Sequence, residues 1–251
     1  KGARGTKVDL SLLHSSSNEE YNVEIVRDRI PIHSVVASFI LEEHVGYIKV
    51  IRFSATTAAE FAQAMHDLEQ DGATSVIVDL RANGGGYMSA ATEMIDRFLD
   101  QGLGIVYTEG KASPRRDYVS KYDGEYRNWP IAVLIDESSA SASEIFAGAM
   151  QDNDRGLIVG RRSFGKGLVQ EEFEVPNSNE GSGALRLTVA RFYTPSGRAI
   201  QKPYGEGIDY EHDYEDRLQS GELFLNDSVI KTDSVVYRTL FGREVFGGGG
   251  I

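Results

Sequence analysis

The chain has 251 residues, 41% of them hydrophobic and 25% charged, which is ordinary globular composition and enough for a sizeable core. Its formal net charge of -12 disfavours binding to nucleic acid or to an anionic membrane surface, because both need a cationic face. The absence of cysteine excludes disulfides, thiolate metal sites and cysteine nucleophiles. No window reaches the apolar length of a membrane span, and the first residues show no signal-peptide pattern.

The first 29 residues predict a β-hairpin. Residues 6–14 and 21–27 alternate apolar and polar side chains with a period of two, and a polar stretch separates them. After Pro31, the stretches "SVVASFI" and "GYIKVIRF" predict two further strands. The next stretch, "TTAAEFAQAMHDLEQDG", predicts an amphipathic helix that ends at its glycine.

The middle of the chain alternates predicted strands and helices. "SVIVDL" and "IAVLID" are continuous apolar runs, typical of strands covered on both faces, and "SAATEMIDRFLDQG" and "EIFAGAMQD" predict helices. Further strands are predicted at "GLIVG", "GLVQEEFEV" and "ALRLTVARFYT". This alternation predicts a mixed α/β fold. Residues 203–233 are polar and acidic, and we expect little regular structure there.

A serine-rich stretch, "DESSASASEIFAGAMQD" at residues 136–152, lies where a predicted buried strand gives way to a helix. Unpaired N–H groups and the positive end of the helix dipole converge at such a point. Serine is a preferred N-cap, so position alone favours a structural role for each serine. A nucleophile placed here, however, would gain an oxyanion site from the N–H of the following residue.

A serine nucleophile needs a base, and the histidines do not supply an evident one. The five histidines lie in no glycine-rich or otherwise functional context, and no G-x-S-x-G elbow occurs; they are His14, His33, His44, His66 and His212. Nothing in the sequence argues for a Ser/His/Asp triad, although the residue types for one are present.

Lysine is the other option, and the stretch "GRRSFGKGLVQ" at residues 160–170 places Lys166 between two glycines. One interpretation is a phosphate-binding loop, because Gly160 precedes Gly165 and Lys166 at the required spacing. However, Gly167 stands where that loop needs a hydroxyl, and a strand rather than a helix is predicted to follow. The other interpretation is a desolvated, neutral lysine that acts as the general base for a serine.

Residues 139–170 resemble the signature of the carboxyl-terminal processing, or tail-specific, serine peptidases. That signature combines an S-A-S-A-S-E run with F-G-K-G-x-V-Q, and both motifs are present at the family's spacing. The resemblance implies that Ser141 is the nucleophile, that Lys166 is its general base and that Gln170 orients the lysine. Cleavage would proceed through an acyl-enzyme and would need no metal and no cofactor.

Further blocks resemble the family in the family's order: "GYIKVIRF", "VIVDLRANGGG", "LRLTVARFYTPSGRAIQKP" and "GREVFGGGGI". The resemblance implies an oxyanion hole formed by the N–H of Gly85 or Gly86 together with that of Ala142. Gly84 stands where many members have proline, which leaves the choice of glycine open. Glu144 and Asp152 match acidic positions of the signature and are expected to support the catalytic residues, although ordinary places on a helix surface are an equal alternative for both.

The resemblance also implies an architecture. We expect residues 1–29 to be the last hairpin of a PDZ-like domain and residues 30–251 to be a crotonase-like peptidase core that normally continues beyond this chain. The protein would be exported to the periplasm or cell envelope of a bacterium, cleave unstructured protein C-termini, bind no nucleic acid and be a candidate for oligomer formation. Two alternatives stay open: a catalytically weak or inactive peptide-binding member of the same fold, and a nucleotide-binding protein that uses residues 160–166.

Overall fold

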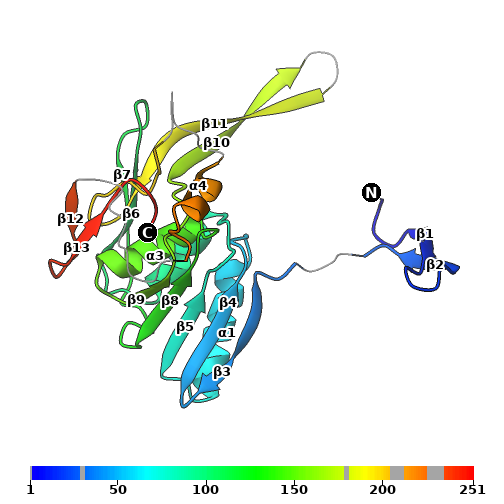
Figure 1. Cartoon of the computed structure of the whole chain (residues 1–251), viewed down its shortest axis with the longest axis horizontal. Coiled ribbons are helices and arrows are strands. Elements are labelled where there is room, and N and C mark those ends of the chain that lie inside the picture. The colour runs from blue at the N-terminus through cyan, green and yellow to red at the C-terminus, as the bar shows by residue number, and fades with distance from the viewer. Residues whose placement is uncertain (1, 29–31, 178–180, 204–211, 225–234) are drawn as a thin grey trace. The chain divides into compact units, whose positions relative to one another are not determined.

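The computed structural model describes residues 2–28, 32–177, 181–203, 212–224 and 235–251, which form two units (Figure 1). The first unit, Lys1–His33, contains the antiparallel strands β1 (Lys7–Leu13) and β2 (Glu20–Val26). The predicted hairpin is therefore confirmed. Nearly all of its side chains are exposed, including Leu13 at 58% and Val26 at 54%.

The second unit, Ser34–Ile251, is built on a five-stranded sheet in the order β3-β4-β5-β8-β9. Its strands are β3 (Val35–Glu42), β4 (Val45–Val50), β5 (Ser75–Asp79), β8 (Ile131–Ile135) and β9 (Leu157–Gly160). The strand β3 pairs antiparallel with β4, and the four others are parallel to one another. The carboxyl ends of these parallel strands share one edge, where α/β proteins place their sites.

Three helices connect these strands: α1 (Thr57–Gln70), α2 (Met88–Asp96) and α3 (Ala142–Asp152). All three were predicted, and α2 ends before the second half of its predicted stretch. Of these, α3 is buried along almost its entire length, which suits its small and apolar side chains. Phe146 of α3 packs edge-on against Phe98, whose ring also meets Phe61 of α1. This packing holds the first residue of α3 in a defined place.

A second, antiparallel sheet has the order β10-β11-β6-β7. Its strands are β10 (Leu168–Asn177), β11 (Gly181–Tyr193), β6 (Gly104–Glu109) and β7 (Arg116–Val119), and β10 and β11 extend away from the rest of the unit in Figure 1. A small hairpin of β12 (Val236–Arg238) and β13 (Glu244–Phe246) follows near the end of the chain. The sequence predicted β10 and β11 but not the four short strands.

The acidic stretch at residues 203–233 contains a helix, α4 (Asp213–Gln219), so the expectation of little regular structure is wrong for these seven residues. Residues 204–211 and 225–233 lie outside the described residues. Seven residues are too few to show a helical period. Tertiary contacts hold α4, because its Arg217 is 4% exposed and donates to the carbonyls of Arg162 and Ser163.

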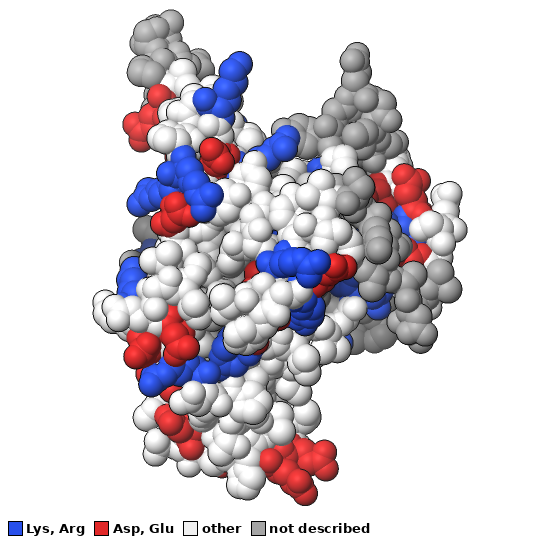
Figure 2. All heavy atoms as spheres, turned by 90° about the vertical axis from the view of Figure 1, so that its left-hand side faces the viewer, with Lys and Arg blue, Asp and Glu red and all other residues white. Residues whose placement is uncertain are grey.

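Charges are mixed on the molecular face drawn in Figure 2. Lys and Arg side chains there lie beside Asp and Glu side chains instead of forming one continuous basic patch. Within the described ranges, no helix has both the length and the apolar character needed to cross a bilayer.

Candidate active site

Three loops meet at the carboxyl edge of the parallel strands. A glycine loop, residues 81–87, follows β5; a serine turn, residues 136–141, follows β8; and a lysine loop, residues 161–167, follows β9. Because β5, β8 and β9 are neighbours in the sheet, these three loops are neighbours in space. The sequence motifs therefore converge on one edge of the fold.

The serine turn distinguishes Ser141 from its neighbours. Ser139 and Ser143 are fully buried, and their hydroxyls donate to the carbonyls of Leu80 at 2.8 Å and Asn83 at 2.9 Å. Ser141 is only half-buried and stands immediately before the first residue of α3. The two buried serines thus have structural hydrogen bonds, and Ser141 is the one placed for chemistry at the helix N-terminus.

The backbone of Ser141 is strained, with φ 57° and ψ −111°. Such a conformation costs about 1–3 kcal/mol for a residue other than glycine and persists only where surrounding contacts impose it. The contacts are present, because Ala140 N–H donates to the Asn83 carbonyl at 3.0 Å and Phe164 N–H donates to the Ser139 carbonyl at 2.9 Å. The turn is therefore held by both neighbouring loops.

The carboxylate of Glu144 joins the serine turn to the lysine loop. Its Oε2 accepts the backbone N–H of Ser141 at 2.7 Å and that of Lys166 at 2.8 Å. Its Oε1 accepts the hydroxyl of Ser163 at 2.6 Å and the N–H of Gly165 at 2.6 Å. Glu144 is 0% exposed, and this burial raises its pKa. All four partners are donors, so the arrangement fits the ionised carboxylate.

The glycines of the lysine loop allow it to pack against residues 200–202. Gly165 has φ +85°, and its carbonyl accepts the N–H of Lys202 at 2.9 Å. A Cβ atom at Gly167 would lie 2.5 Å from the backbone nitrogen of Gln201, a contact that no other residue could make. The strand β10 begins directly after this loop. The phosphate-loop interpretation is therefore wrong, because no helix N-terminus follows the lysine.

Half-buried Lys166 faces a pocket of about 370 Å³. The pocket lies between the serine turn, the glycine loop and α4, and its lining residues are Gly84, Glu137, Ser138, Ala140, Phe164, Lys166, Asp213, Tyr214 and Arg217. None of these is a histidine. The pocket therefore offers a space beside Ala140, the residue before Ser141, in which a side chain of a bound peptide would fit.

The glycine loop packs directly on Ser141. A Cβ atom at Gly85 would lie 2.7 Å from Cβ of Ser141 and 2.9 Å from the nitrogen of Ala142. The N–H of Gly85 donates to Oδ1 of Asn83 at 2.9 Å. Within the part of the chain that the structure describes, the N–H groups of Gly86 and Ala142 have no hydrogen-bond acceptor. Two unused donors thus lie near Ser141, one in the glycine loop and one at the first residue of α3.

A buried carboxylate holds the beginning of the glycine loop. Asp79 is 1% exposed and accepts hydrogen bonds from Tyr47 at 2.6 Å, Lys49 at 3.0 Å and the Arg81 side chain at 2.6 Å. Burial opposes its ionisation, but hydrogen bonds led by that from Arg81 keep its pKa below the usual range. The sequence interpretation gave Asp79 no role. The local feature that could have indicated a role for Asp79 is its position as a charged residue at the end of an apolar strand.

Two predicted site residues lie away from this convergence. Gln170 lies in β10 beside a register shift, with its side chain exposed, and in the described structure it makes no hydrogen bond to Lys166. Asp152 ends α3, about 16 Å along the helix from Ser141. Its carboxylate binds Arg198 at 2.9 Å and Ser196 at 2.6 Å. The structure therefore brings together the predicted residues except these two.

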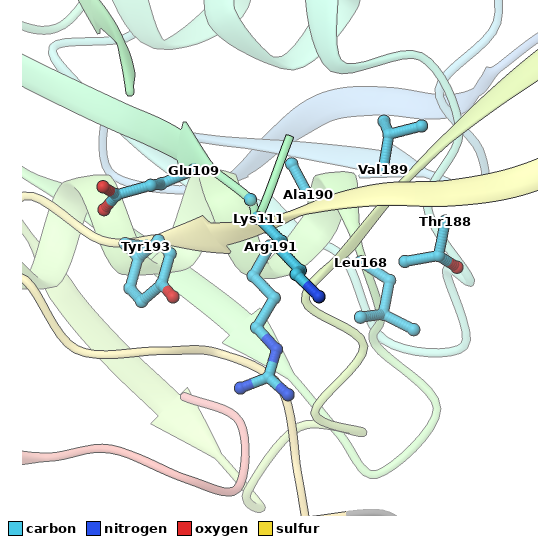
Figure 3. Close-up of a pocket in the computed structure, with 9 residues that line it drawn as sticks. Glu109, Lys111, Leu168, Thr188, Val189, Ala190, Arg191 and Tyr193 are labelled. Atoms are coloured by element: carbon cyan, nitrogen blue, oxygen red, sulfur yellow. The ribbon is translucent and has the colours of Figure 1, made fainter. Parts of the chain in front are cut away.

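A second pocket, of about 480 Å³, lies on the antiparallel sheet where β6, β10 and β11 meet (Figure 3). Lys111 and Arg191 are its two cationic lining residues, and Glu109 is its acidic one. Leu168 also lines it, two residues after Lys166. The pocket is thus close to the lysine loop in sequence but contains neither Ser141 nor Lys166.

Sequence comparisons relate the chain to known peptidases. The family model of peptidase family S41 matches residues 44–213. The carboxyl-terminal-processing protease of Picosynechococcus sp. is 36% identical over 204 residues, covering 80% of this chain and 48% of that protein. The carboxy-terminal processing protease CtpA of Bacillus subtilis is 36% identical over 203 residues, covering 80% of this chain and 42% of that protein.

Among solved structures, a photosystem II D1 C-terminal processing protease superposes with a TM-score of 0.59 at 31% identity, covering 80% of this chain and 54% of that one. The chain spans about half the length of the curated relatives that it matches.

Proposed function

The chain belongs to peptidase family S41, and from that premise we propose that it forms the catalytic part of a serine peptidase that cleaves protein substrates near their C-termini. The observation that carries the proposal is the shared hydrogen bonding of Ser141 and Lys166 to one buried carboxylate. That contact fixes the backbones of a nucleophile and a base relative to each other. Fixed orientation of this kind is a large part of what an enzyme contributes to a reaction.

In the proposed reaction, Oγ of Ser141 bonds to the carbonyl carbon of the scissile peptide, and its proton passes to the neutral amine of Lys166. The carbon–nitrogen bond then breaks, and Lys166 returns the proton to the leaving amine. Water next loses a proton to Lys166 and attacks the acyl-enzyme, and Lys166 passes that proton to Oγ of Ser141 as the ester bond breaks, which releases the new C-terminus and regenerates both residues. No step needs a metal or a cofactor.

The oxyanion of the tetrahedral intermediate would be stabilised by backbone N–H groups. We assign Ala142 and Gly86 this role, because their N–H groups are without an acceptor in the described structure. Gly85 is the other candidate, and its use would require Asn83 to release it. The positive end of the α3 dipole adds to the stabilisation of negative charge at this point.

The substrate is proposed to be an unstructured protein C-terminus, in line with the processing activity named for the relatives. We also propose that the first unit is the last hairpin of a PDZ-like domain; its two strands bury little apolar surface, and an isolated two-stranded hairpin is at best marginally stable in water. On the basis of similarity to bacterial processing proteases, we infer that the protein acts outside the cytoplasm, in the periplasm or cell envelope.

One observation favours a second candidate function. Because the exposed Gln170 makes no hydrogen bond to Lys166 in the described structure, the lysine is without the hydrogen bond expected to orient it. A protein in this state would bind peptide chains without cutting them, or would cut them slowly. The lysine loop and the pocket would then serve binding alone.

Hydrolysis of an unfolded casein-like protein separates the two candidates. The peptidase proposal predicts that the parent protein cuts this substrate into fragments and that Ser141→Ala does not. Peptide binding without cleavage by both proteins would support the second candidate and contradict the first. Identical cleavage by both would show that Ser141 is not the nucleophile.

A further inference from the structure

The last residues of the chain form a glycine strap, residues 248–251, that lies against the lysine loop. The N–H groups of Gly248 and Gly250 donate to the carbonyls of Ala199 and Ile200, each at 3.1 Å. On the other side, the side chain of Arg162 donates to the carbonyl of Gly249 at 2.7 Å. The strap therefore bridges the 199–202 segment and the lysine loop.

Ser163 is the point at which the strap meets the catalytic arrangement. Its side chain is fully buried, and its hydroxyl accepts the N–H of Ile251 at 2.8 Å. The same hydroxyl donates to Oε1 of Glu144 at 2.6 Å. The backbone N–H of Ser163 in turn donates to the carbonyl of Ile251 at 3.1 Å. The Ser163 hydroxyl thus accepts one hydrogen bond and donates another, so its orientation is fixed.

Only glycine fits at the contact point of the strap. Gly250 has φ +95°, and a Cβ atom there would lie 2.6 Å from Oγ and 2.8 Å from the carbonyl oxygen of Ser163. Any side chain at position 250 must therefore displace Ser163 or the strap.

We propose that Ser163 is a positioning residue, which couples the glycine strap to the catalytic pair through Glu144. The inference rests on the proposed peptidase function and extends it. An O–H donor to a carboxylate makes a strong, short hydrogen bond, so Ser163 fixes where Oε1 of Glu144 lies. The position of Oε1 determines that of Oε2, which holds the N–H groups of Ser141 and Lys166.

The lysine loop has a second support that does not pass through Glu144. Arg217 of α4 donates to the carbonyl of Ser163 at 3.2 Å and to that of Arg162 at 2.6 Å. Glu222 binds Arg162 and Arg217 together. Because these contacts involve no hydroxyl of Ser163, the loop keeps its course when that hydroxyl is removed. Loss of Ser163 should therefore loosen the catalytic pair without unfolding the loop.

The test compares Ser163→Ala and Gly250→Ala with a matched glycine control. Gly242→Ala is that control, because Gly242 also has a positive φ, +88°, but has no heavy atom within 4 Å of its added Cβ. For each variant, kcat and KM are measured on a peptide substrate, and backbone amide hydrogen exchange is measured for residues 141–144 and 163–167.

We expect kcat to fall about tenfold or more in Ser163→Ala and Gly250→Ala, the effect of losing one hydrogen bond to a charged group. KM should change little, because Ser163 does not touch the substrate. The amides of Gly165 and Lys166 should exchange faster in both variants and at the parent rate in Gly242→Ala. Ser163→Thr keeps the hydroxyl but crowds a buried site, so it should lose stability yet retain more kcat than Ser163→Ala.

Parent-like kcat and parent-like amide exchange in Ser163→Ala would overturn the inference. An equal loss of kcat in Gly242→Ala would also overturn the inference, because such a loss would be a general effect of backbone strain at a glycine with positive φ. The exchange measurement keeps this judgement separate from the proposed function. If the parent cleaves nothing, the peptidase proposal fails, whereas amide exchange at Gly165 and Lys166 still decides whether the strap is coupled to them.

Discussion

Ser141 and Lys166 donate their backbone N–H groups to the same atom, Oε2 of Glu144, at 2.7 and 2.8 Å. The two residues are distant in sequence and come from loops after different strands. A single buried carboxylate therefore sets the distance between the proposed nucleophile and the proposed base. It also explains why a charged residue is buried at the start of α3, where the helix dipole favours an anion.

Glu144→Gln should lower kcat by about 10- to 100-fold. The amide keeps the shape of the side chain, but in either orientation its NH₂ group faces donors, the N–H groups of Ser141 and Lys166 on one side or those of Ser163 and Gly165 on the other, which then lose their acceptor. Steady-state kinetics checks the result, with the exposed Glu93→Gln of α2 as the control. Parent activity in Glu144→Gln would show that this carboxylate does not position the pair.

Lys166→Arg should be folded and inactive, with kcat/KM reduced by about 10²- to 10⁴-fold, the usual contribution of a general base. The guanidinium stays protonated near neutral pH and so has no site to accept the proton of Ser141. Circular dichroism establishes folding, and peptide hydrolysis measures the loss. Full activity in Lys166→Arg or in Lys166→His would contradict the role of Lys166 as the base.

The neighbouring serines should behave differently from Ser141. Ser139→Ala and Ser143→Ala each remove a hydroxyl that donates to a buried carbonyl, so each should cost about 1–3 kcal/mol in the free energy of unfolding. Measurable cleavage should nevertheless survive in both. Urea unfolding and casein cleavage, measured on the same samples, separate the two effects. Complete loss of cleavage by well-folded Ser139→Ala would reopen the choice of nucleophile.

Asp79→Asn should weaken the fold in a pH-dependent way. Interactions that keep the pKa of Asp79 below its usual value of 3.8 stabilise the native state above that pH, and this stabilisation is lost as the pH falls further. The variant should therefore be less stable than the parent at pH 7, and the difference should narrow below about pH 3.8. Urea unfolding at several pH values measures both. A difference that does not vary with pH would show that the charge of Asp79 is not what matters.

Asp152→Ala should be costly for stability and mild for catalysis. It leaves Arg198, which is 3% exposed, without its ion-pair partner, and breaking a buried pair in this way typically costs about 3–5 kcal/mol. The folded fraction should keep a kcat close to that of the parent, because Asp152 lies at the far end of α3. The exposed pair Arg115–Asp117 offers a control, since Asp117→Ala should change stability little. A selective loss of kcat would instead place Asp152 in the catalytic arrangement.

The sequence predicted those elements whose pattern is local. The hairpin of β1 and β2 alternates with a period of two, β5 and β8 are continuous apolar runs, and α1 has a helical apolar stripe, so the local spacing of apolar residues identifies them. The short strand β7, "RDYV", and the seven-residue α4 have no such pattern: β7 is defined by its pairing with β6, and α4 by the contacts of Arg217 with the lysine loop. Local propensity carries little information about elements of that length.

The same division applies to the site. The sequence led to the proposal of Ser141 and Lys166 because they lie in long motifs, whereas it marked Glu144 only as an acidic position of one motif. The position of the Glu144 carboxylate depends on hydrogen bonds from Ser163 and Gly165, which come close to it because β9 pairs with β8. Asp79 likewise gains its role from Lys49 of a neighbouring strand. Such contacts produce no pattern in the spacing of residues along the sequence, so they become visible only in the three-dimensional structure.

The most direct test of the account is the site at which a fluorophosphonate probe, which reacts with activated serine hydroxyls, becomes attached. Mass spectrometry of the labelled parent protein should find the adduct on Ser141, with labelling absent in Ser141→Ala and strongly slowed in Lys166→Arg. An adduct on Ser138, Ser139 or Ser143, or labelling that proceeds equally fast without Lys166, would contradict the proposed nucleophile and base.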